Sequence, residues 1–127
     1  MTTADALRAF VKQLVREEQY DSSEGCWCFR SGGSCLVCTD SAIKVARQFG
    51  GKVFGYDCTQ NPSSIIGKQF CAGHDFAIVE HRFLVDYWAY RVISLIADPV
   101  FDLLSEEDFR AARSLYGHQD NWEEVVV

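Results

Sequence analysis

Two apolar segments joined by a short polar turn give this chain its strongest strand signal. Phe76–Val79 and Phe83–Val85 flank the turn Glu80-His81-Arg82. Segments of this length, rich in Val, Ile and Phe and separated by charged residues, are typical of a β-hairpin. The sequence therefore predicts an antiparallel pair of strands around which the other elements must pack.

Two amphipathic helices are predicted before this hairpin. The first covers about residues 4–19, where apolar side chains recur at helical spacing. The second begins near Ser34 or Cys35 and ends at Gly50-Gly51, because glycine commonly terminates a helix. The apolar stripe of the first helix consists of Leu7, Phe10, Val11, Leu14 and Val15.

The other segments have weaker patterns. The Ser-, Gly- and Cys-rich stretch Asp21–Ser34 predicts a loop, and Asp57–Gly73 has no clear periodicity. Lys52–Tyr56 and Val92–Ile96 are predicted strands, and a last helix follows the capping residue Ser105. The order of helix, helix, strands and helix indicates an α+β fold rather than a doubly wound α/β fold.

Composition limits the possible functions. The chain has 127 residues and a formal charge of −6, without a Lys/Arg cluster, so we expect one domain (1–127) and no nucleic-acid partner. No apolar run approaches the roughly 20 residues that span a bilayer, and Met1–Asp5 lacks the pattern of a signal peptide. We therefore expect a cytoplasmic protein with no membrane partner.

Cys35 is the candidate nucleophile. It follows Ser31-Gly32-Gly33-Ser34 and is predicted to lie in the first turn of the second helix. The free N–H groups and the positive end of the helix dipole stabilise a thiolate at such a position. The preceding glycines also allow backbone amides to approach an oxyanion.

His74 and Asp86 are the candidate partners of that thiol. If the hairpin turn places Val79 opposite His81 or Phe83, even-numbered residues of both strands share one face. His74 and Asp86 then lie across from each other or diagonally, within reach of a carboxylate–imidazole hydrogen bond. A turn with the other parity would separate them. A nucleophilic Cys needs such a base, and the base needs an orienting group.

These motifs resemble bacterial papain-fold hydrolases, including papain-fold toxin and effector domains. The similar segments are Gly33–Cys38 with the following Gly50-Gly51, and Gly73–Val79 with Val85-Asp86. The resemblance implies an α+β, papain-like fold in which the nucleophile helix packs on a small antiparallel sheet. It implies Cys35 as nucleophile, His74 as general base and acid, and Asp86 as orienting residue.

Two positions depart from that family. Ser34 stands where these domains often have Asn, and the Gln that papain-like enzymes supply a few residues upstream is absent. The oxyanion would depend on the backbone N–H of Cys35 and a second donor, for which Gln19, Gln60 and Gln69 are candidates.

Two other functions fit parts of the sequence. The pairs Cys26/Cys28 and Cys35/Cys38, with Cys58, Cys71 and His74 further on, could form a structural zinc site. A catalytically inactive papain-like module could instead bind a protein through exposed aromatic side chains.

We expect a cysteine-dependent hydrolase or acyl transferase that acts on an amide or similar acyl bond of a protein or peptide. It would need no metal or cofactor. Peptidase, deamidase, amidase and transferase chemistry all remain open.

Overall fold

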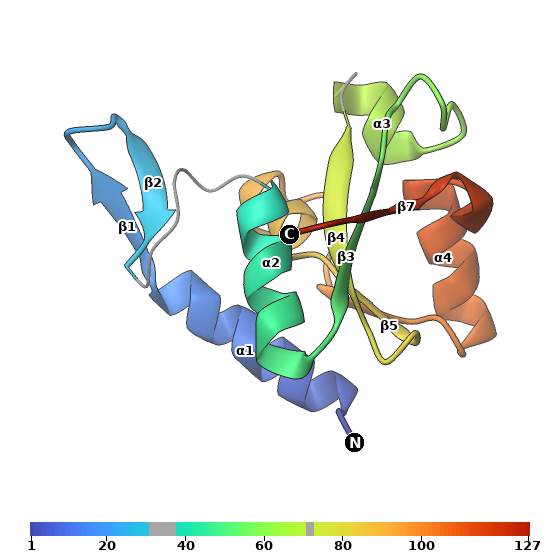
Figure 1. Cartoon of the computed structure of the whole chain (residues 1–127), viewed down its shortest axis with the longest axis horizontal. Coiled ribbons are helices and arrows are strands. Elements are labelled where there is room, and N and C mark those ends of the chain that lie inside the picture. Colours follow the sequence, from blue (N-terminus) through green and yellow to red (C-terminus); the bar gives the residue numbers. More distant parts are fainter. Residues whose placement is uncertain (31–37, 71–72) are drawn as a thin grey trace.

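A computed structural model of the chain describes residues 1–30, 38–70 and 73–127. Within them, the fold is mixed α+β, with two antiparallel sheets (Figure 1). The α-helices are α1 (Ala4–Arg16), α2 (Cys38–Phe49), α3 (Ile65–Phe70) and α4 (Glu106–Tyr116), and the shorter helices are η1 (Trp88–Val92) and η2 (Gln119–Asn121). The strands are β1 (Glu18–Asp21), β2 (Cys26–Phe29), β3 (Lys52–Tyr56), β4 (His74–Val79), β5 (Phe83–Val85), β6 (Val100–Asp102) and β7 (Glu123–Val125).

The larger sheet has helices on both faces. In the described part of the chain its strand order is β6-β5-β4-β3-β7, with each neighbouring pair antiparallel. Figure 1 shows α1 and α2 on one side of this sheet and α3 and α4 on the other. Because side chains alternate along a strand, such a sheet must be apolar on both faces. The nearly unbroken apolar sequences of β4 and β5 meet that requirement.

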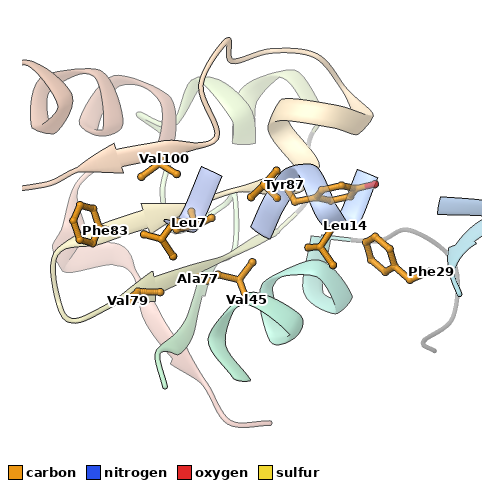
Figure 2. Packing of buried hydrophobic residues seen from close by; sticks show 11 residues of the cluster. Leu7, Leu14, Phe29, Val45, Ala77, Val79, Phe83, Tyr87 and Val100 are labelled. Atoms are coloured by element: carbon orange, nitrogen blue, oxygen red, sulfur yellow. The ribbon is translucent and has the colours of Figure 1, made fainter. Parts of the chain in front are cut away.

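The face toward α1 and α2 contains odd-numbered residues of the central strands. Ala77 and Val79 of β4 pack there with Leu7 of α1 and Val45 of α2 (Figure 2). The opposite face contains even-numbered residues, which pack against α3 and α4. That second cluster includes Phe76, Ile78, Leu84, Ile66, Ala112 and Tyr116.

The β4–β5 hairpin forms as predicted. Val79 pairs with Phe83, so residues of the same parity share a face. Glu80 and His81 adopt positive φ angles of 55° and 53°, and the N–H of Arg82 donates to the carbonyl of Val79 at 3.0 Å. Two successive residues with positive φ make a turn whose twist matches that of the flanking strands.

Several predicted boundaries are wrong. The first helix ends at Arg16, and Gln19 lies in β1, which pairs with β2 inside the stretch predicted as a loop. Residues 65–70 form α3, where no element was predicted. The predicted strand Val92–Ile96 is absent: η1 ends at Val92, and the strand in this region, β6, follows Pro99.

The capping prediction at Ser105 is confirmed, since its hydroxyl accepts a hydrogen bond from the N–H of Asp108. Glu123 and Glu124 belong to β7 at the edge of the sheet. Among the described residues, no helix is both long enough and apolar enough to cross a membrane.

Candidate active site

His74 and Asp86 meet inside the protein. His74 is the first residue of β4, and Asp86 directly follows β5. His74 Nε2 lies 2.6 Å from Asp86 Oδ2, and both residues are buried, with exposed fractions of 3% and 2%. The parity of the hairpin explains the contact, because the observed register places these residues diagonally on one face.

Asp86 is held by the backbone as well as by His74. The N–H of Ala89 donates to Asp86 Oδ1 at 3.0 Å, and the Asp86 N–H donates to the carbonyl of Pro99 at 2.9 Å. The carboxylate therefore caps the turn that begins η1. A buried carboxylate is tolerated where hydrogen-bond donors surround it, and here they also fix its direction.

Aromatic rings enclose the imidazole of His74. Its ring centroid lies 5.2 Å from that of Trp88, 6.1 Å from that of Phe76 and 6.0 Å from that of Tyr116. The Tyr116 ring is stacked, with an interplanar angle of 20°. These rings restrict rotation of the imidazole and keep its nitrogens directed at their partners.

The surroundings of His74 favour the protonated form of its ring. Burial lowers the pKa of His74, but the charge of Asp86 and its hydrogen bond oppose burial. A hydrogen bond with Cys38 and the charge of Cys38 act in the same direction as Asp86. The sum raises the pKa of His74 from 6.5 to about 10. Asp86 and Cys38 therefore both favour the form of the imidazole in which each ring nitrogen carries a proton.

Cys38 is the thiol that contacts this imidazole. It is a free, half-buried cysteine and the first residue of α2. The hydrogen bond between the Cys38 side chain and the imidazole is made in addition to the contact of His74 Nε2 with Asp86. A thiol and a carboxylate thus both contact the imidazole of His74.

The residues beside Cys38 fix the first turn of α2 on the sheet. The Thr39 hydroxyl donates to Asp75 Oδ2 at 2.5 Å, and the Ser41 hydroxyl donates to the carbonyl of Cys38 at 3.0 Å. Asp75 follows His74 in β4, and Thr39 follows Cys38 in α2. The Thr39–Asp75 hydrogen bond therefore joins the residues next to Cys38 and His74. Gly55 of β3 leaves room for that carboxylate, because a Cβ there would lie 2.0 Å from Asp75 Oδ1.

Cys35, the predicted nucleophile, lies outside the described residues, as do Ser34 and the oxyanion position that was expected beside them. Cys38 was considered from the sequence as a possible zinc ligand, and no role as a nucleophile was predicted for it. Cys38 precedes Ala42 by four residues and therefore lies on the same helix face as the buried Ala42 and Val45. That spacing could have identified a thiol facing the sheet.

Tyr116 is a second residue that the sequence analysis did not place in the site. Its hydroxyl donates to Asp86 Oδ2 at 2.8 Å. A buried tyrosine hydroxyl needs a polar partner, and a carboxylate in the apolar segment Phe83–Ala89 needs hydrogen-bond donors. Those two requirements together were the available signal.

The cysteines that were predicted as possible zinc ligands differ in their bonding. Cys26 is disulfide-bonded, whereas Cys28, Cys38 and Cys58 are free. In the described ranges, no three His, Cys, Asp or Glu side chains are grouped so that they could hold a metal ion. Of the glutamines considered as oxyanion donors, Gln19 lies in β1, with its side-chain amide 3.9 Å from the sulfur of Cys28.

Comparisons with known proteins find no match to this chain among family models, curated proteins or solved structures. Function is therefore inferred from the geometry of the site.

Proposed function

We propose that this protein is a papain-like cysteine hydrolase or acyl transferase in which Cys38 is the nucleophile, His74 the general acid and base, and Asp86 the orienting group. The observation that carries the proposal is the continuous set of contacts from Cys38 to His74 to Asp86. A thiol paired with an oriented imidazole is the arrangement required for nucleophilic catalysis. The packing of α2 on an antiparallel sheet supports the papain-like part of the proposal.

The protonated form of His74 suits the first half of the reaction. A cationic imidazolium stabilises a neighbouring thiolate. The Cys38 sulfur attacks the carbonyl carbon of an amide, forming a C–S bond while an electron pair moves to oxygen. That pair returns as the C–N bond breaks, and His74 donates its proton to the leaving nitrogen. The products are a thioester on Cys38, a free amine and a neutral imidazole.

The second half restores the enzyme. Neutral His74 takes a proton from water or an amine as that molecule attacks the thioester carbonyl. The C–S bond breaks, and Cys38 leaves as a thiolate beside the regenerated imidazolium. Water gives a carboxylic acid, whereas an amine gives a new amide. The same residues can therefore support hydrolysis, side-chain deamidation or acyl transfer on a protein or peptide substrate.

Alkylation by iodoacetamide tests the nucleophile without a known substrate. We expect Cys38 to react fastest at about pH 6, where an ordinary thiol is protonated. His74→Ala should slow this reaction by about tenfold or more, because the cationic partner is lost. The reacting cysteine is identified by mass spectrometry of the digested protein.

Cys58→Ser is the matched control, because Cys58 is also free and half-buried. It should leave the fast alkylation unchanged, whereas Cys38→Ser should abolish it. Fast reaction at Cys35 that persists in Cys38→Ser would return the nucleophile to Cys35. Equal reaction of the free cysteines in wild type and in His74→Ala would contradict an active thiol and favour a catalytically inactive binding module.

A further inference from the structure

The hydroxyl of Tyr116 and the imidazole of His74 share one oxygen atom. Tyr116 donates to Asp86 Oδ2 at 2.8 Å, and His74 Nε2 lies 2.6 Å from the same oxygen. Tyr116 has an exposed fraction of 0%, so water does not compete for this hydrogen bond. The contact joins the end of α4 to a group that is 30 residues away in the sequence.

The end of α4 is itself fixed by side-chain hydrogen bonds. Asn61 Nδ2 donates to the backbone carbonyl of Tyr116 at 2.7 Å, and the indole N–H of Trp122 donates to the same carbonyl at 2.9 Å. The Ser64 hydroxyl donates to the carbonyl of Leu115 at 2.8 Å. Tyr116 therefore has little freedom to follow Asp86 if that carboxylate moves.

In this contact the Tyr116 hydroxyl is the donor and the Asp86 carboxylate is the acceptor. Burial and the nearby charge of Asp86 raise the pKa of Tyr116 well above 10, so its hydroxyl stays protonated and can donate. The N–H of Ala89 holds the other carboxylate oxygen. With both oxygens restrained, the carboxylate cannot rotate away from His74.

We propose that Tyr116 is a positioning residue of the site, which fixes the Asp86 carboxylate so that His74 stays aligned with Cys38. This inference rests on the proposed function, since it assigns Tyr116 a role in the same reaction. Tyr116 touches neither the thiol nor the reacting carbonyl in this scheme, and it acts only through Asp86.

Tyr116→Phe removes the hydroxyl and keeps the stacked ring. We expect the alkylation of Cys38 at about pH 6 to slow by about fivefold, less than in His74→Ala. The matched control is Tyr87→Phe, because Tyr87 is another buried tyrosine whose hydroxyl binds a carboxylate, that of Glu18. The control should be alkylated at the wild-type rate.

A double variant separates positioning from general stability. If Tyr116 acts through Asp86, adding Tyr116→Phe to Asp86→Asn should not slow alkylation further. A purely structural role would lower the melting temperature and leave the alkylation rate of the folded protein unchanged. Trp122→Phe, which removes a restraint on the Tyr116 backbone but not the hydroxyl, gives a second test, with an expected slowing of about twofold.

The outcomes distinguish this inference from the proposed function. Wild-type alkylation in both Tyr116→Phe and Trp122→Phe, together with slow alkylation in His74→Ala, would overturn the positioning role alone. Wild-type alkylation in His74→Ala would overturn the proposed function. An additive loss in the double variant would also contradict the positioning role.

Discussion

At the scale of single residues, Asp86 controls the charge of His74. An asparagine at this position keeps the shape but not the charge, and its NH2 group can donate to the unprotonated Nε2 of a neutral ring. Burial then acts on the imidazole without the opposing carboxylate. The pKa of His74 should fall from about 10, by about one to three pH units, in Asp86→Asn.

NMR titration of the histidine ring protons measures this change. His118 is a useful internal reference, because it lies outside the site, near Asp120. An unchanged His74 titration in Asp86→Asn, with the His118 titration also unchanged, would mean that Asp86 does not set the proton affinity of the ring.

At the scale of elements, the sequence could predict pairs of residues within one hairpin better than contacts between elements that are distant in the sequence. The parity of β4 and β5 follows from alternation and turn length, so the His74–Asp86 contact could be foreseen. The predicted helix start near Ser34 or Cys35 falls outside the described residues and stays a prediction, whereas the contact between Cys38 and His74 joins elements that are distant in the sequence.

Other elements had no periodic signal at all. β1 and β2 have four residues each, and α3 has six, which is too short to show a repeating pattern. Tyr116 joins the site through the packing of α4 on the sheet, which no local pattern in the sequence specifies. The α+β class and the His74–Asp86 contact were therefore predictable, whereas the contacts that Cys38 and Tyr116 make with these two residues were not.

The contact between Thr39 of α2 and Asp75 of β4 gives a prediction at this scale. In Gly55→Ala the new Cβ would lie 2.0 Å from Asp75 Oδ1 and 3.0 Å from the carbonyl oxygen of His74. We expect this crowding to displace Asp75 from Thr39 and to lower the free energy of unfolding by about 1–3 kcal/mol, as measured by urea denaturation.

Asp75→Ala provides the control for that prediction. If the crowding acts mainly on the Asp75 carboxylate, Gly55→Ala should cost much less in the Asp75→Ala background than in wild type. An equal cost in both backgrounds would show that the crowding acts on the backbone of β4 instead.

At the scale of the whole molecule, the buried polar side chains of the site must find hydrogen-bond partners as the chain folds. In the part of the chain described here, every buried side-chain nitrogen or oxygen has a hydrogen-bond partner. Because the pKa of His74 is higher in the folded protein (about 10) than its ordinary 6.5, folding favours the protonated ring. This contribution to stability is fully present below pH 6.5 and is lost as the pH rises toward 10.

Comparison with His74→Gln isolates that contribution. The free energy of unfolding of wild type, relative to this variant, should decrease steadily between about pH 6.5 and 9, as measured by urea denaturation at each pH. A difference that is constant over this range, or that grows with pH, would contradict a raised pKa for His74.

The anchoring of Asp86 by Tyr116 has a consequence for synthesis of the protein. His74 and Asp86 precede Tyr116 in the sequence, so a growing chain contains the imidazole and the carboxylate before it contains the tyrosine that restrains the carboxylate. Strand β7, which pairs with β3, also emerges late. The Asp86 carboxylate is therefore restrained only after α4 has been synthesised and has docked on the sheet.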